Sequence, residues 1–116
     1  MVKSYYLTFG FSKQDKVGLG EIISSKLGIQ LKTLSRGTLG YRFGPVAETL
    51  SILENYVEEE DCWQEEAHQH FPILVTASFT HGKNEDKEKR ANNVRKILQT
   101  INDLIEIRFE IIESEN

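Results

Sequence analysis

Phe71-Pro72-Ile73-Leu74-Val75-Thr76-Ala77-Ser78-Phe79 is the strongest strand signal in this 116-residue chain. The stretch begins with a nearly continuous run of apolar residues, which is typical of a strand that is buried in the middle of a sheet. Proline lacks the N–H group that a central strand uses for hydrogen bonding, so Pro72 is compatible with a strand only near its beginning. We therefore predict a central β-strand over residues 71–80.

An amphipathic helix is predicted directly after this strand, over residues 84–103. Asn84 can cap its N-terminus, and two acidic residues occupy the first turn, where the helix dipole favours negative charge. The apolar residues form one stripe at helical spacing: Ala91, Val94, Leu98, Ile101 and Ile105. Residues 104–112 then alternate between apolar and charged side chains, which predicts a half-buried strand whose charges face water.

The N-terminal part of the chain is predicted to contain one strand and one short helix. Residues 4–11 are rich in aromatic side chains and carry no charge, so we expect a strand there. Residues 12–20 are polar and contain glycine, which favours a loop. Residues 20–28 have apolar side chains near helical spacing and end at a glycine, which predicts a short helix.

The middle of the chain contains a predicted hairpin and one ambiguous segment. Residues 29–35 and 38–44 are strand-like and are separated by the turn signal Ser35-Arg36-Gly37. Residues 46–57 fit two structures. Their apolar side chains have the spacing of one helical face, yet those of residues 50, 52 and 56 also fit one face of a bent strand.

Length and composition are typical of a single globular domain over residues 1–116. The chain is 39% hydrophobic and 28% charged, which is enough apolar material for one core without disulfides. Cys62 is the only cysteine, so an internal disulfide is impossible and a reducing, cytoplasmic location is expected. The N-terminus lacks the apolar stretch of a signal peptide, and no window is long enough for a membrane span.

The charges are strongly segregated along the chain. Residues 43–82 contain eight acidic residues and no lysine or arginine, so this window has a formal charge of -8. The remaining 14 basic and 10 acidic residues give the rest of the chain a charge of +4. Such asymmetry biases partners through electrostatic steering, and here it favours a basic protein partner.

The usual signatures of enzymes are weak in this sequence. Cys62 lies among acidic residues, which raise a thiol pKa and lower its reactivity. Gly18-Leu19-Gly20 precedes the first predicted helix but lacks the rest of a phosphate-binding motif. A metal site could be built from Glu66, His68, His70 and His81, yet three histidines are an ordinary number for a chain of this length. We therefore expect no catalytic residue, no cofactor and no metal.

A nucleic-acid interface is the next alternative, because basic residues are concentrated in the second predicted helix. They are interleaved with acidic residues, and the chain as a whole is acidic. A solvated helix face explains this pattern better. We expect neither a nucleic-acid partner nor a membrane partner.

The segment 58–66 is the most function-like feature of the sequence. It combines six carboxylates with the only tryptophan of the chain, and tryptophan is enriched at binding hot spots. A basic protein surface would complement it, although Trp63 could instead anchor a loop onto the core. The candidate binding residues are Glu58, Glu59, Glu60, Asp61, Trp63, Glu65 and Glu66.

Residues 38–80 resemble the layout of immunity proteins of bacterial polymorphic toxins, including contact-dependent growth inhibition systems. The resemblance is carried by four short motifs: Gly40-Tyr41-Arg42-Phe43-Gly44-Pro45, Leu50-Ser51-Ile52-Leu53-Glu54-Asn55-Tyr56-Val57-Glu58, Trp63-Gln64-Glu65-Glu66 and Phe71-Pro72-Ile73-Leu74-Val75. It implies that residues 49–57 form a strand. It also implies a cytoplasmic protein that binds and blocks a cognate toxin domain, often a nuclease.

Together these observations predict an α+β fold. We expect a mostly antiparallel sheet of about five to six strands, including one over residues 48–57, with two helices packed on one face. The expected function is neutralisation of a cognate toxin by a monomer or weak dimer that is not an enzyme. Two alternatives stay open: a small self-associating regulatory or adaptor domain, and a metal-dependent hydrolase.

Overall fold

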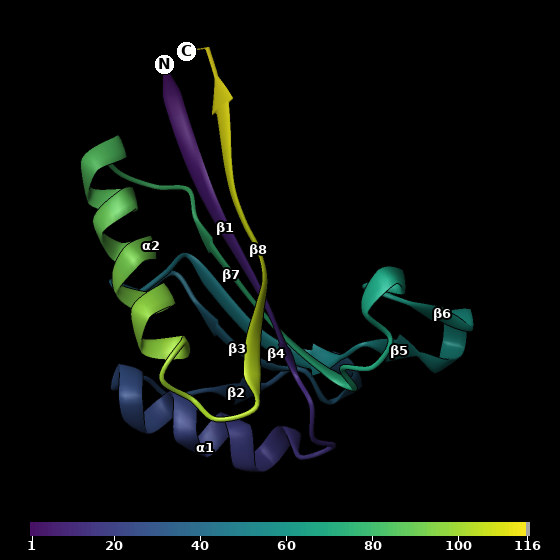
Figure 1. Ribbon diagram of the computed structural model, residues 1–116. Helices are drawn as coiled ribbons and strands as arrows, with labels where there is room; N and C mark the ends of the chain where they lie inside the picture. Colours follow the sequence, from purple (N-terminus) through teal and green to yellow (C-terminus); the bar gives the residue numbers. More distant parts are fainter. Residues whose placement is uncertain (116) are drawn as a thin grey trace.

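The computed structural model describes residues 1–115, and its central strand is β7 (Ile73–Phe79). This strand pairs antiparallel with β1 (Val2–Phe11) on one side and with β4 (Thr49–Glu54) on the other (Figure 1). The central strand predicted over residues 71–80 is confirmed. Pro72 lies just before its first residue, where its missing N–H group costs no hydrogen bond of the sheet.

The fold is α+β, as predicted, with six antiparallel strands in the order β2-β3-β4-β7-β1-β8. The strands not yet placed are β2 (Lys32–Thr33), β3 (Leu39–Arg42) and β8 (Leu104–Ser114). A separate two-stranded ladder is formed by β5 (Tyr56–Val57) and β6 (Cys62–Trp63). The helices are α1 (Lys16–Leu27) and α2 (Asn84–Leu98), and three 3-10 turns are η1 (Ser35–Gly37), η2 (Glu58–Glu60) and η3 (Glu66–His68).

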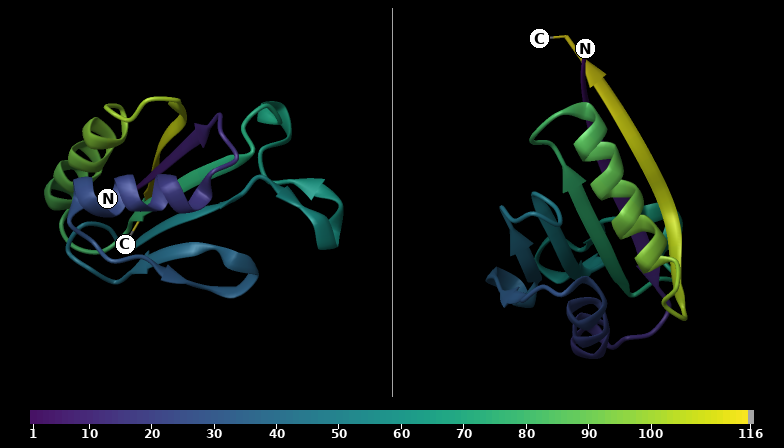
Figure 2. Two further views of the ribbon diagram at one scale, coloured as in Figure 1. Left: turned by 90° about the horizontal axis from the view of Figure 1, so that it is seen from below. Right: turned by 90° about the vertical axis from the view of Figure 1, so that its left-hand side faces the viewer.

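Both helices cover the same face of the sheet, where they enclose the hydrophobic core (Figure 2). Helix α2 lies over β1 and β7, and α1 lies over β4 and contacts α2. Alternate residues of β1 point into this core, and Tyr5, Leu7 and Phe9 are fully buried there. Each such side chain contributes roughly 1.5–3 kcal/mol through burial of apolar surface. On the opposite face of the sheet, the central strands carry several hydroxyl side chains, among them the bonded pair Thr49 and Ser78.

Helix α1 begins four residues earlier than the sequence predicted. The side chain of Asp15 caps it by accepting a hydrogen bond from the N–H group of Gly18, at 2.9 Å. The stretch Gly18-Leu19-Gly20, predicted as part of a loop, is therefore inside the helix, and Leu19 is fully buried. The C-terminus is at Gly28 as expected, where a left-handed conformation with φ of 65° ends the helix.

Helix α2 is shorter than the prediction of 84–103, because the chain turns tightly after Leu98. Backbone hydrogen bonds join residues three apart in this turn, and Ile101 remains buried in the core. Asn84 does not cap the helix. Its side chain instead bonds the N–H group of Lys3 and the carbonyl of Met1, which ties the start of α2 to β1.

The ambiguous segment 46–57 forms a strand in its middle, as the resemblance implied. Leu50 and Ile52 are fully buried in β4, on the face that the helices cover. The predicted strand 48–57 is too long, however, because β4 ends at Glu54 and the chain then leaves the sheet. The predicted strand 29–35 is also too long, since only Lys32 and Thr33 pair with β3.

The strict alternation predicted for the last strand is interrupted by a β-bulge. Arg108 pairs with Thr8, and the next pair is Glu106 with Phe9, so Ile107 is an extra residue. The bulge turns Glu106 toward α2, where it forms an ion pair with Arg95 at 2.6 Å instead of facing open water. Ile105 and Ile111 are left about half exposed, at 54% and 50%.

Candidate interaction arm

Residues 55–70 form an arm that projects from the sheet between β4 and β7 (Figure 1). The arm contains the short strands β5 and β6, whose residue pairs are Tyr56 with Trp63 and Val57 with Cys62. The turn η2 connects these two strands. The acidic segment 58–66 that the sequence singled out lies entirely on this arm.

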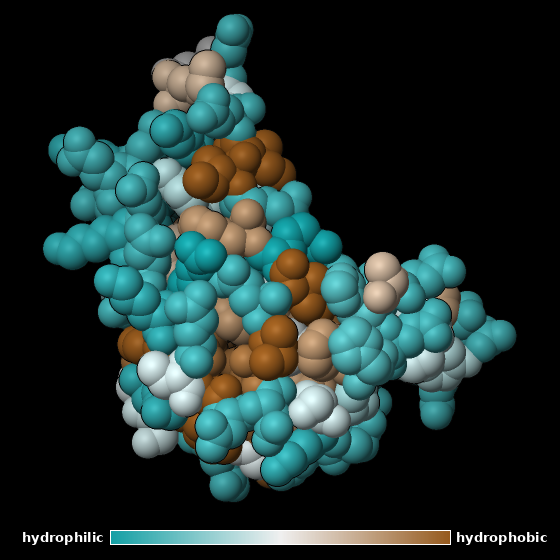
Figure 3. Space-filling model, in the orientation of Figure 1, coloured by the Kyte–Doolittle hydropathy of each residue, from teal (hydrophilic) through white to brown (hydrophobic). Residues whose placement is uncertain are grey.

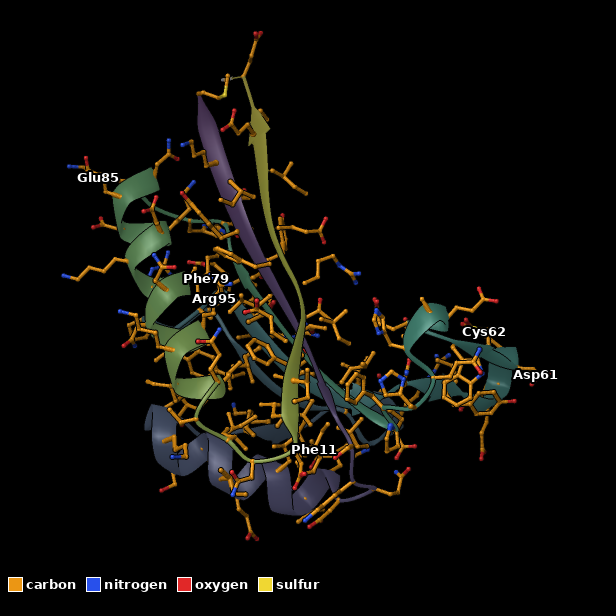
Figure 4. The ribbon with its side chains drawn as sticks, in the orientation of Figure 1. Phe11, Asp61, Cys62, Phe79, Glu85 and Arg95 are labelled. Atoms are coloured by element: carbon orange, nitrogen blue, oxygen red, sulfur yellow. The ribbon has the colours of Figure 1, made fainter. Side chains whose placement is uncertain are left out.

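Local contacts between aromatic and acidic side chains shape the tip of the arm. The rings of Tyr56 and Trp63 pack against each other with their centroids 5.1 Å apart. The chain reverses at Asp61, which adopts the left-handed conformation with φ of 47°. The Tyr56 hydroxyl donates a hydrogen bond to the Asp61 carboxylate, and this bond raises the pKa of Tyr56. Figure 4 shows Asp61 and Cys62 at the end of the arm far from the sheet.

Asn55 fixes the base of the arm, and its side chain is 0% exposed. Its amide nitrogen donates to the carbonyls of His68 and Phe71, at 3.0 and 2.9 Å. Its amide oxygen accepts from the N–H group of Glu65 at 2.8 Å. The Asn55 backbone carbonyl also accepts from Gln64, and its N–H group donates to Pro72. One buried, fully bonded residue thus joins both ends of the arm, which holds the arm in one conformation.

The structure places the seven predicted binding residues on one arm, but it gives them different surroundings. Glu58, Glu59 and Glu66 are exposed, and the ion pairs found within residues 1–115 do not involve them. Glu60 lies 3.9 Å from Arg36, with both side chains largely exposed. Glu65 is half-buried and pairs with Arg108 of β8 at 2.6 Å.

Trp63 is half-buried against Tyr56 and is not part of the hydrophobic core. The interpretation that it anchors a loop onto the core is therefore not supported. The thiol of Cys62 lies 3.7 Å from a Glu60 carboxylate oxygen. Desolvation and then the charge of Glu60 raise the pKa of this thiol, so it is mainly protonated at neutral pH and is a poor nucleophile.

A groove of about 440 Å³ separates the arm from the η1 turn. Glu54, Glu58 and Glu59 contribute carboxylates to its walls, and Tyr56 and Leu53 contribute apolar surface. Arg36 lies on the η1 side of the groove. The long side chain of a lysine or arginine could bury its methylene groups here and keep its charge near the carboxylates.

Only two of the three histidines lie together, His68 and His70, whose ring centroids are 6.0 Å apart. His68 and His70 lie on the arm, and the His70 ring packs on Phe71 with a centroid distance of 4.1 Å. His81 follows the other end of β7, where its carbonyl accepts a hydrogen bond from Arg90. Within residues 1–115, no three His, Cys, Asp or Glu side chains are arranged to hold a metal ion. The hydrolase alternative built on Glu66, His68, His70 and His81 gains no support from this geometry.

Sequence reasoning missed the two residues that position the arm, Asn55 and Arg108. Asn55 interrupts an apolar strand pattern, and a polar residue at an otherwise buried position was the available signal. Glu65, the partner of Arg108 on the arm, lies 43 positions away in the chain, so no local pattern could identify this contact.

No protein-family model, curated protein or solved structure matches this chain. In residues 1–115 we also find no helix with the length and apolar content required to cross a lipid bilayer.

Proposed function

We propose that this protein is an immunity protein that binds a cognate toxin domain and neutralises it through the acidic arm. The observation that carries the proposal is the combination of a projecting, internally braced arm with exposed carboxylates at Glu58, Glu59 and Glu66. A braced loop loses little conformational entropy when it binds a partner.

The toxin that fits this surface is basic, and a nuclease is the preferred class. Nuclease domains bind phosphate backbones, so their clefts carry lysine and arginine. An acidic arm inserted into such a cleft would occupy the phosphate positions and exclude the nucleic acid. The groove beside η1 could receive one basic side chain of the toxin, and Trp63 with Tyr56 could contribute the apolar centre of the contact.

This role places the protein in the bacterial cytoplasm, where it would protect its own cell. A standard interface of about 800 Å² per partner is larger than the arm tip alone, so neighbouring parts of the sheet would also take part. Association driven by opposite charges is fast and is slowed by salt.

The test compares two triple variants that change the net charge equally. The first converts Glu58, Glu59 and Glu66 to Lys, and the matched control converts Glu21, Asp86 and Glu115, which are exposed elsewhere. The role we propose requires a cognate toxin module, which we expect to be encoded next to this protein. With that module as the partner, affinity and protection of toxin-expressing cells are both measured.

We expect the arm variant to lose at least about 100-fold in affinity and to lose protection, because three carboxylates then repel a basic cleft. The control should bind and protect like the unmodified protein. Equal affinity of the arm variant and the unmodified protein would refute an electrostatic role of the arm.

A further inference from the structure

Strand β8 forms one edge of the sheet and offers a long row of unpaired backbone groups. It is 11 residues long and pairs only with β1, whereas the opposite edge strand β2 has two residues. Exposed edges of this length are templates for pairing with another strand.

The exposed side chains of β8 are unusually apolar for an edge strand. Ile105, Ile111 and Ile112 are 54%, 50% and 52% exposed. In Figure 3, whose view has β8 in front, hydrophobic surface lies along this strand between polar regions. Ile111 is opposite Tyr5 of the core face and Ile112 is its neighbour on the other face, so both faces of the edge carry apolar surface.

The centre of β8 is complementary to itself. Within one copy Arg108 already lies 3.2 Å from Glu110. In an antiparallel pair with a two-fold axis at Phe109, Arg108 of each copy would also lie opposite Glu110 of the other, so the four charges would form one network. A positive and a negative side chain that lie directly across two neighbouring strands stabilise the sheet. The two-fold symmetry produces this pair twice. The same register places Ile107 opposite Ile111 of the second copy.

The bulge limits how far this pairing can extend. Ile107 is the extra residue, so beyond it the two strands no longer present matching faces. The paired segment is therefore about residues 107–111, which is short. A contact of this length is smaller than a standard interface, so we expect a weak dimer rather than an obligate one.

We propose that a second copy of this chain docks antiparallel along β8, which forms a continuous sheet through the two copies. Both sets of helices then lie on one face, and both arms project from the other. The surface differs from the acidic face of the arm, but the two are linked through Arg108, which bonds Glu65 of the arm at 2.6 Å.

Sedimentation equilibrium of the full chain tests the proposal, with reducing agent present because Cys62 is exposed. The variant is Glu110→Arg, which places two arginines opposite each other in the dimer. The matched control is Glu113→Arg, which makes the same charge change on the same strand but lies outside the paired segment 107–111. The double variant Arg108→Glu/Glu110→Arg recreates both pairs between the copies, and it also replaces the Glu65–Arg108 contact of each copy with two carboxylates.

We expect a dimer in the micromolar range that Glu110→Arg weakens by about ten-fold or more, since the change acts twice. The control should leave the dissociation constant within about two-fold, and the double variant should restore most of the lost affinity relative to Glu110→Arg. Thermal unfolding of each variant shows whether it is folded. A monomer up to about 1 mM, or equal effects of Glu110→Arg and Glu113→Arg, would overturn the proposal.

Discussion

The carboxylate of Glu65 on the arm lies 2.6 Å from the guanidinium group of Arg108 on the last strand. The hydrogen bond to Glu65 is the main reason that the pKa of Arg108 is raised, as expected when a carboxylate stabilises the charged guanidinium. The arm contributes little to the hydrophobic core. This contact links it to β8, the edge strand of the main sheet. Glu65, predicted as a binding residue, is thus engaged within the fold.

Replacing Glu65 with Gln should loosen the arm while the sheet stays intact. The change removes the charge but keeps the shape, and a half-exposed ion pair contributes at most about 1 kcal/mol to the free energy of unfolding. Amide hydrogen exchange is the sensitive measurement. We expect faster exchange at Gln64 and residue 65, whose N–H groups bond Asn55, and unchanged exchange in β7.

Glu66→Gln is the control, because Glu66 is exposed and the ion pairs within residues 1–115 do not include it. Identical exchange rates in the two variants would show that the Glu65–Arg108 contact does not hold the arm.

Asn55→Ala should destabilise the arm far more than any exposed substitution. It leaves the N–H group of Glu65 and the carbonyls of His68 and Phe71 without their partner in a buried position. We expect a loss of about 2–3 kcal/mol in the free energy of unfolding. Urea denaturation measures the loss, and limited proteolysis should show cleavage within residues 55–70 first.

The control for this variant is Gln69→Ala, because Gln69 is an exposed residue of the same arm. A surface substitution usually changes the free energy of unfolding by about 0.5 kcal/mol or less. If Asn55→Ala also stays that close to the unmodified protein, the Asn55 side chain has no structural role.

Local patterns predicted the type of each long element except β4, for which they fitted helix and strand alike, and tertiary contacts decided where each element ends. The run at residues 71–79 and the stripe of α2 are strong local signals, and both elements exist. β4 stops at Glu54 because the buried Asn55 bonds backbone groups far along the chain. The extra residue in β8 likewise depends on pairing with β1, which no pattern within residues 104–114 reveals.

The candidate site was predicted as a stretch of sequence, but its organisation could not be predicted. The structure places the segment 58–66, which charge and the single tryptophan had singled out, on a projecting arm, and its role in binding stays a prediction. Which carboxylates are free depends on partners at Tyr56, Arg36 and Arg108. These contacts become visible only when the strands are assembled.

Gly10→Ala should displace Phe71, which packs flat against the backbone of β1 next to the arm. A methyl group at Gly10 would lie 2.3 Å from two carbon atoms of the Phe71 ring, closer than any tolerated contact. Phe71 is buried, so the ring has little space to move. We expect a loss of about 1–3 kcal/mol in the free energy of unfolding, measured by urea denaturation.

The cause can be isolated with Phe71→Leu, whose smaller side chain leaves room for the added methyl group. In that background Gly10→Ala should lower the free energy of unfolding clearly less than in the unmodified protein. If Gly10→Ala lowers the free energy of unfolding equally in both backgrounds, contact with Phe71 is not the reason that Gly10 is required.

Acid should destabilise the protein through two carboxylates that the fold keeps ionised. Burial alone would raise the pKa of Glu48, but the N–H group of Thr80 and the guanidinium of Arg90 outweigh it, so the pKa is lowered. The hydrogen bond from Arg95 is the main cause of the lowered pKa of Glu106. A carboxylate with a lowered folded-state pKa contributes stability above its unfolded pKa and loses it as the pH falls through the folded value.

We therefore expect the free energy of unfolding to be nearly constant from pH 7 to about pH 5 and to fall below that. Glu48→Gln/Glu106→Gln should be less stable at pH 7, because each change weakens a charged hydrogen bond worth roughly 1.5–3 kcal/mol. Its stability should also decline less between pH 5 and pH 3, since these groups no longer take up protons on unfolding. Urea denaturation at several pH values measures both effects. If the free energy of unfolding of the variant falls as steeply between pH 5 and pH 3 as that of the unmodified protein, Glu48 and Glu106 are not the source of the acid sensitivity.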